Sequence, residues 1–166
     1  MSEQAVQLFS IGHSNVEAQA LIDLLRRHAI ATVCDVRSAP YSRYNPQFNR
    51  EALAASLQDA GIVYRFLGDA LGGKSTGNAV RTADGAPPDY DTIRAEPRFV
   101  RGLDQLIALG SAGPTAFMCA EADYHSCHRH RLISPALIGR GVTVWHIMHD
   151  GRLEQGTIEA RQMRMF

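Results

Sequence analysis

This sequence has very little lysine, no long apolar run and no excess of positive or negative charge. Lys74 is the single lysine among 17 basic residues, and 17 acidic residues balance them to a net charge of zero. No apolar run approaches the roughly 20 residues that span a bilayer, so we expect no membrane partner. Because the chain has no excess of positive charge, no overall electric field attracts nucleic acid. Nucleic acid is therefore a possible partner, but it is not favoured.

Cysteine is scarce as well. The three cysteines are an odd number without regular spacing, which argues against a disulfide framework and favours a reducing compartment. The first residues lack the basic segment and apolar core of a signal peptide. We therefore predict a cytoplasmic protein.

The composition is otherwise that of an ordinary globular domain. Of the 166 residues, 45% are hydrophobic and 20% are charged. A chain of this length buries roughly two-thirds of the surface that it exposes when unfolded. We predict that residues 1–166 form a single α/β domain.

Strand and helix patterns alternate along the chain. Short apolar runs predict strands, and helical spacing of apolar residues follows most of them. Ser14 and Glu17 form a capping-box pattern, Asn49 is placed to cap a second helix, and Pro135 should kink or break the last long helix. The alternation predicts the α/β class, as a three-layer Rossmann-like sandwich around a parallel sheet of about five strands. The predicted strands cover residues 6–11, 32–36, 63–67, 115–120 and 142–147.

Two stretches lack this alternation. Residues 68–97 are rich in glycine and proline, and they predict a loop of the length that is typical of lids or disordered segments. Residues 150–166 are polar and rich in arginine, and we expect a short terminal helix there.

Polar side chains collect where the predicted strands end, and open α/β sheets bind ligands at the carboxyl ends of their strands. The densest group, between Cys119 and Arg131, follows the fourth strand. We predict that it meets polar residues from the other strand ends around one cleft. The candidate catalytic residues are Glu121, Asp35, Cys119, Cys127, His128 and His13, and the candidate substrate-binding residues are Arg37, Arg43, Arg129, Ser14, Asn15, Gly72 and Gly73.

Several motifs occur in an order that resembles one known family. They are Ile11 to Asn15, Asp35 to Pro40 with Ser42 and Arg43, Leu67-Gly68 followed by Leu71 to Gly73, Met118 to Glu121, Cys127 to Arg129, and Val144 with His146 and Ile147. This series, which runs over nearly the whole chain, resembles the domain of unknown function 488 family. The resemblance implies an α/β sandwich of Rossmann-like topology and implies no particular reaction.

Two motifs suggest a more specific function, a phosphate loop and a zinc site, and we disfavour both interpretations. Residues 68–75 satisfy the phosphate-loop pattern, but the glycines and prolines that follow do not predict the helix that a triphosphate cradle needs. Cys119, Cys127 and His128 invite a zinc site, yet structural zinc ligands usually come in pairs two to four residues apart and these cysteines are eight apart. We predict no metal site, and we also disfavour oxidation of Cys119 with Cys127.

For several of the candidate residues, a purely structural role is an alternative to a functional one. Cys34 lies inside an apolar strand, where a core position is the simpler interpretation. Cys119 is open to the same interpretation, because free cysteine is often buried. Asp35 could form a structural ion pair with Arg37 or Arg129 rather than act in chemistry.

The pattern favours an enzyme, a hydrolase or transferase, that acts on a small anionic or nucleotide-like substrate at this edge of the sheet. The arginines would hold the anion, and Glu121 or Asp35 would act as general base or nucleophile. His13 or His128 would move protons, and Cys127 could act as a thiolate. The alternatives are a non-catalytic ligand-binding or regulatory module that uses the same pocket, and a metal-binding Cys/His site. The sequence identifies neither a cofactor nor an oligomeric state.

Overall fold

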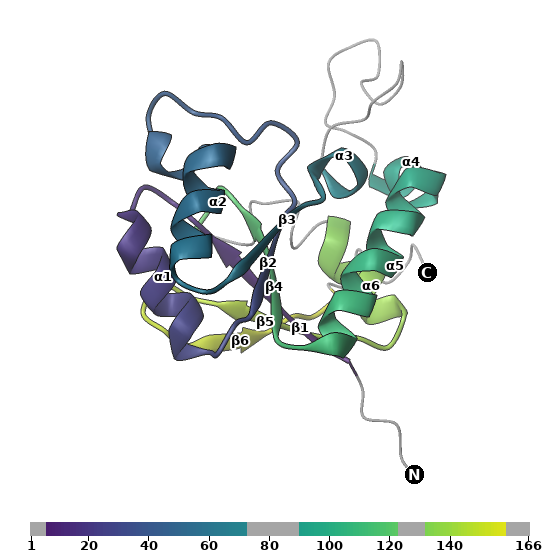
Figure 1. Cartoon of the computed structure of the whole chain (residues 1–166). Coiled ribbons are helices and arrows are strands. Elements are labelled where there is room, and N and C mark those ends of the chain that lie inside the picture. Colours follow the sequence, from purple (N-terminus) through teal and green to yellow (C-terminus); the bar gives the residue numbers. More distant parts are fainter. Residues whose placement is uncertain (1–5, 73–89, 123–131, 159–166) are drawn as a thin grey trace.

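A six-stranded sheet forms the centre of the protein (Figure 1). The computed structural model describes residues 6–72, 90–122 and 132–158. The strands lie in the order β3-β2-β4-β1-β5-β6, and all neighbours are parallel except the antiparallel pair β5 and β6. The strands are β1 Gln7–Gly12, β2 Thr32–Asp35, β3 Val63–Phe66, β4 Thr115–Cys119, β5 Thr143–Ile147 and β6 Leu153–Gln155.

The five strands that the sequence predicts are confirmed, each to within one residue at either end. They could be recognised because a parallel strand covered on both faces is an almost unbroken apolar run. In the central strand β4 every residue from Thr115 to Cys119 is buried.

Residues 153–155 of the last stretch form the strand β6, which the sequence analysis did not predict, and residues 159–166, where a terminal helix could still fall, lie outside the described residues. A tight turn joins β5 to β6, in which Gly151 adopts a φ of 90° and its N–H donates to the Met148 carbonyl. The chain therefore folds back along β5, and the sheet is mixed rather than purely parallel.

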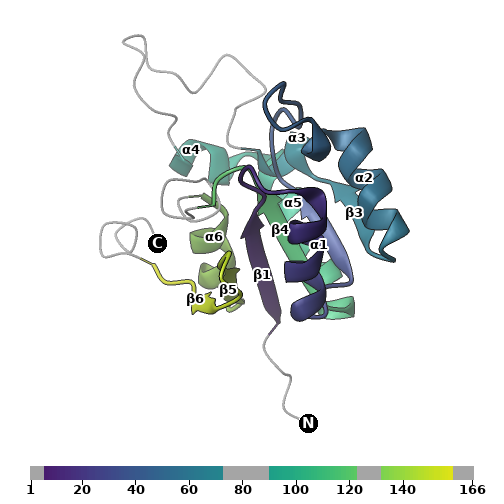
Figure 2. The same cartoon turned by 90° about the vertical axis from the view of Figure 1, so that its left-hand side faces the viewer.

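Helices lie on both sides of the sheet, and the strand order explains which helix lies where. The connections β1 to β2 and β2 to β3 run toward one edge of the sheet, whereas β3 to β4 and β4 to β5 run toward the other. Right-handed crossovers then place α1 and α2 on one face and α5 and α6 on the other, as Figure 1 shows and as Figure 2 shows from the α1 side. The helices are α1 Ala18–Arg27, the 3-10 helix η1 Pro46–Phe48, α2 Arg50–Asp59, α3 Gly68–Leu71, α4 Tyr90–Ala95, α5 Pro97–Ala112 and α6 Ser134–Gly139.

Each face of the sheet has its own apolar core. Leu25, Leu57 and Phe48 are fully buried on the side of α1 and α2. Leu106 and Leu137 are fully buried on the side of α5 and α6. No helix within the described ranges is long and apolar enough to cross a membrane.

One of the two predicted helix caps has the predicted position: Asn49 is the N-cap residue of α2, although its side chain makes no capping bond. The helix α1 begins at Ala18 after the N-cap residue Glu17, whose side chain makes no capping bond, so the capping box predicted at Ser14 is wrong. Ser14 instead adopts a left-handed conformation with a φ of 53°. Pro135 lies in the first turn of α6, where a missing N–H costs nothing, and residues 132 and 133 just before α6 form a π-helical turn, while the start of the predicted helix lies outside the described residues.

The predicted loop at residues 68–97 contains two short helices, α3 and α4, at its ends. Within α3, the N–H groups of Ala70, Leu71 and Gly72 donate to carbonyls of the same turn. They are therefore not open to a phosphate, and this half of the phosphate-loop pattern forms a helix.

The helix α3 comes unusually close to the segment that follows β2. A Cβ added at Gly68 would lie 1.9 Å from the Arg37 carbonyl oxygen, and one added at Gly72 would lie 2.2 Å from the Ser38 hydroxyl. Both glycines thus permit a backbone approach that no larger residue allows.

Gly68→Ala should lower the free energy of unfolding by about 1–3 kcal/mol, because the new methyl group overlaps a backbone oxygen that cannot move away cheaply. Urea denaturation would measure the change. Gly113→Ala is the matched control, since a Cβ there meets nothing within 4 Å and its φ of 177° suits any residue. Equal stabilities of the two variants would contradict the prediction.

Candidate functional site

The carboxyl ends of β2, β4 and β1 form the place where the topology favours a ligand. The connection that leaves β4 runs in the opposite direction to those that leave its neighbours β2 and β1. Such a switch in direction opens a crevice beyond the strand ends in open α/β sheets. Polar residues from β1 and β2 meet at this edge, and backbone bonds join them to the end of β4.

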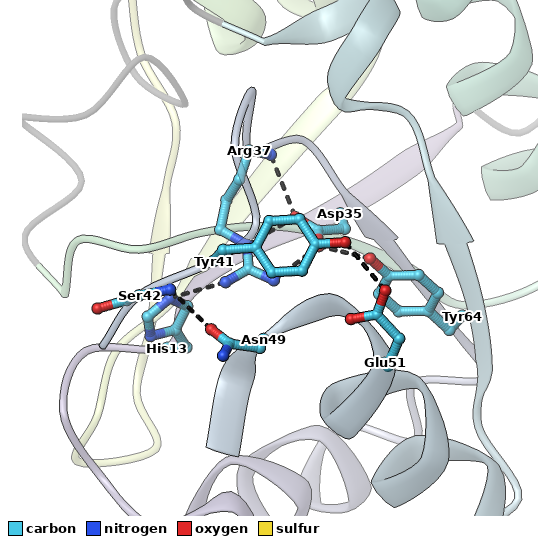
Figure 3. Close-up of polar contacts among 8 residues, drawn as sticks. All are labelled: His13, Asp35, Arg37, Tyr41, Ser42, Asn49, Glu51 and Tyr64. Carbon is cyan, nitrogen blue, oxygen red and sulfur yellow. Dashed lines mark hydrogen bonds and ion pairs between the residues drawn. The ribbon is translucent and has the colours of Figure 1, made fainter. Parts of the chain in front are cut away.

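A buried ion pair between Asp35 and Arg37 is the centre of the site (Figure 3). Asp35 is 0% exposed and Arg37 is 8% exposed. Arg37 donates from Nε to Oδ1 over 2.9 Å, from Nη2 to Oδ2 over 2.7 Å, and from its backbone N to Oδ1 over 3.1 Å. This fork-shaped pairing confirms the structural ion pair that the sequence left open.

His13, at the end of β1, joins the pair through the guanidinium group. Arg37 Nη1 lies 3.3 Å from His13 Nε2, and His13 Nδ1 donates to the Ser14 carbonyl over 2.6 Å. Burial lowers the pKa of His13 from 6.5 to about 4, and the nearby Arg37 charge acts in the same direction. His13 is therefore neutral at pH 7, with the proton on Nδ1 and a lone pair on Nε2 that accepts from Arg37.

Two residues that the sequence analysis missed complete this network. Tyr64, on β3, donates its hydroxyl to Asp35 Oδ2 over 2.6 Å, and burial together with this bond raises its pKa. The ring of Phe48, fully buried, stacks on His13 with 4.5 Å between the ring centroids. Tyr64 could be found only from the pairing of β2 with β3, and no sequence signal marks Phe48.

Backbone hydrogen bonds tie the three strand exits together. His13 N donates to the Cys119 carbonyl over 2.9 Å, and Ser14 N donates to the Ala120 carbonyl over 2.8 Å. From the β2 side, Val36 N donates to the Met118 carbonyl over 3.0 Å. The left-handed Ser14 is thus held in a sparsely populated conformation by its neighbours, which is common at functional sites.

The sulfur chemistry differs from the prediction. Cys119 is buried and disulfide-bonded, although the sequence spacing disfavoured a disulfide. Its partner lies outside the described residues, because Cys34 is free. Spacing along the chain cannot show which Cβ atoms come close, which is why the sequence analysis was wrong here. For Cys34, burial raises the pKa to about 12, which confirms it as an inert core residue.

The remaining predicted site residues are divided between the surface and the undescribed segments. Glu121, next to Ala120, and Asn15, next to Ser14, are exposed at this same edge. Arg43 is exposed on the loop after β2 and makes no contact with the buried network among the described residues. The predicted residues Cys127, His128, Arg129 and Gly73 lie outside the described ranges. Within those ranges no group of three possible ligands is arranged to hold a metal ion.

Comparison with known proteins identifies the family and nothing more specific. Residues 17–134 match the family model described as domain of unknown function DUF488. The chain belongs to the DUF488 family. No curated protein and no solved structure matches the chain. The family description assigns no reaction, so the function of this DUF488 protein must be argued from its site.

His13 should make the stability of the protein depend on pH. Its pKa is about 4 in the folded protein and about 6.5 when unfolded, so between these values only the unfolded chain takes up the proton. The contribution of His13 to the free energy of unfolding should therefore fall by about 3 kcal/mol as the pH drops from 6.5 to 4, and this contribution should stay constant above that window. Urea denaturation at several pH values would measure it.

His13→Gln is the control for this pH dependence, because it cannot titrate. The difference in stability between wild type and His13→Gln should shrink as the pH falls through the same window, whatever the other histidines contribute. Parallel stability curves for the two proteins would contradict the low pKa.

Tyr64→Phe should cost about 1–2 kcal/mol of stability, since it removes one donor from a buried carboxylate. Tyr41→Phe is a matched control, because the Tyr41 hydroxyl also donates to a carboxylate, Glu51, but in an exposed position. Its loss should change the stability by less than about 0.5 kcal/mol. Thermal or urea denaturation of both variants decides the point, and equal losses would show that Asp35 does not depend on Tyr64.

Proposed function

We propose that this DUF488 protein is an enzyme, a hydrolase or transferase, that binds a small anionic or nucleotide-like substrate beyond the carboxyl ends of β2, β4 and β1. The proposal includes a Rossmann-like, three-layer arrangement, which the helices on both faces of the sheet support. The observation that carries it is the Arg37 guanidinium, which the fold holds rigidly at the switch point of the sheet.

Arg37 retains hydrogen-bonding capacity for a ligand. A guanidinium has five N–H donors, and Nε, Nη1 and Nη2 each use one of them within the described residues, on Asp35 and His13. One N–H on Nη1 and one on Nη2 can therefore face substrate oxygens. Such a pair of donors suits a carboxylate or phosphate group, which binds a guanidinium through two parallel bonds.

The neutral state of His13 allows Arg37 to bind an anion. A protonated His13 would repel the guanidinium, whereas the lone pair on Nε2 accepts from Arg37 Nη1. Both ring nitrogens are already hydrogen-bonded. We infer that His13 orients Arg37 and is not the group that moves protons.

Asp35 and Glu121 have different capacities for acid–base chemistry. Asp35 accepts four hydrogen bonds, three from Arg37 and one from Tyr64, which fill its lone pairs. Glu121 is exposed one residue after Ala120, whose carbonyl binds Ser14. We therefore propose Asp35 as the anchor of Arg37 and Glu121 as the general base.

The second candidate function is a non-catalytic ligand-binding module at the same position. It is favoured by the complete hydrogen bonding of Asp35 and His13 and by the disulfide at Cys119, because none of the three is then a free nucleophile or base. Both candidate functions require the protein to bind the same kind of anion, and they differ only in whether the protein converts it to a product.

Phosphorylated metabolites, nucleotides and carboxylates should raise the melting temperature of the wild-type protein. Ser14→Gly and Asn15→Ala are expected to weaken this shift without unfolding the protein, since both side chains are at least partly exposed at the proposed site. Asp59→Asn, at the opposite end of α2, is the control and should leave it unchanged. If no anion stabilises the wild type, there is no anion site at this edge.

Glu121→Gln separates catalysis from binding. If Glu121 is the general base, turnover of a substrate found in the screen should fall by about 100-fold or more, while the affinity changes little. Steady-state kinetics and calorimetry on the same ligand measure the two quantities. Ligand binding without turnover in the wild type would favour the binding module, and normal turnover in Glu121→Gln would exclude Glu121 as the base.

A further inference from the structure

We propose that the loop of residues 38–50, here called the aromatic loop, binds single-stranded nucleic acid through exposed tyrosine rings and arginines. The aromatic loop follows β2 and runs through η1 to the first residue of α2. The proposal goes beyond the function argued above, because it concerns the surface of this loop and not the buried network beneath it.

Two tyrosines of the aromatic loop are exposed to an unusual degree. The exposed fraction is 58% for Tyr41 and 83% for Tyr44. Aromatic rings normally bury most of their surface, so two exposed rings within four residues leave flat apolar faces in water. Unpaired bases stack on such rings, whatever the sequence of the strand.

Positive charge accompanies these rings. The aromatic loop, residues 38–50, includes Arg43 and Arg50 and no acidic residue, and Glu51, which follows it, accepts a hydrogen bond from Tyr41. The Arg43 guanidinium lies 5.9 Å from the centroid of the Tyr44 ring, and that of Arg50 lies 4.2 Å from the centroid of Phe66. Within the described part of the chain, no acidic side chain forms an ion pair with Arg43 or Arg50.

A guanidinium that rests on an aromatic ring keeps its edge free for hydrogen bonds. Arg43 and Arg50 can therefore hold their positions against the rings while their N–H groups bind phosphate oxygens. Rings and cations on one loop match the two components of a nucleic acid, the bases and the phosphates.

The aromatic loop is held in place although most of it is not helical. Ser42 N donates to Asn49 Oδ1 over 2.7 Å, and Arg50 N donates to the Pro40 carbonyl over 3.0 Å, so two bonds close the loop. Tyr41 is fixed to Glu51 on α2 through its hydroxyl (Figure 3). A partner therefore meets a closed loop and a Tyr41 ring that are already held in place, which lowers the entropic cost of binding.

A single strand fits these features better than the other polyanions do. In a duplex the bases are paired and stacked on each other, so their faces are closed to a tyrosine ring. The local positive charge attracts a phosphate backbone without requiring a positive charge over the whole protein.

Fluorescence anisotropy with labelled DNA and RNA single strands of about 12 nucleotides tests the proposal on the full chain. Tyr44→Ala should weaken binding by roughly 5- to 100-fold, whereas Tyr44→Phe, which keeps the ring, should bind as the wild type does. Arg43→Ala and Arg50→Ala should each reduce the slope of log affinity against log salt by about 0.7. Arg101→Ala, an exposed arginine on α5, should change neither quantity.

Four results would overturn the proposal. They are no binding by the wild type at low salt, equal binding of Tyr44→Ala and wild type, equal binding of duplex and single strand, and displacement of the strand by a mononucleotide of similar affinity. The last result would assign the aromatic loop to a small ligand. Tyr44 is largely exposed, so its variants should fold, and their melting temperatures confirm that loss of binding is not loss of structure.

Discussion

The buried pair of Asp35 and Arg37 is the interaction on which the carboxyl edge of the sheet depends. Removing two charges from water is costly, and only complete hydrogen bonding compensates for that cost. Here Arg37 provides three bonds to Asp35, Tyr64 provides a fourth from β3, and His13 accepts from the guanidinium at the end of β1. The pair therefore fixes side chains from three different strands, and any one of them would leave a buried charge unsatisfied if it moved.

The rest of this edge is adapted to that constraint. Gly68 and Gly72 let α3 approach the backbone of residues 37 and 38, and backbone bonds from His13 and Ser14 reach the end of β4. Within the described residues, the result is a tightly bonded edge with the Arg37 guanidinium at its centre. Rigidity of this kind lowers the cost of ordering a ligand, which is why the site suits the recognition of a small anion whether or not a reaction follows.

Features that depend on interactions between residues close in sequence could be predicted, whereas features that depend on residues far apart in sequence could not. The five parallel strands were predictable because burial on two faces leaves an almost unbroken apolar run, which acts locally. The capping box at Ser14 was wrong because bonds to β4, far away in sequence, hold Ser14 in a left-handed conformation. The strand β6 was missed because a polar edge strand has no apolar run, and its turn depends on one glycine, Gly151.

The sequence by itself determined the class of the fold, the strands and the edge where polar residues gather, since these follow from apolar periodicity and from the chemistry of strand ends. Only the tertiary structure decided what each polar residue does there. It paired Asp35 with Arg37, made His13 neutral, placed Tyr64 and Phe48 in the network, and put Glu121 at an exposed position. The physical reason is that protonation state and hydrogen-bond partner depend on burial and on neighbours from other strands, neither of which spacing along the chain contains.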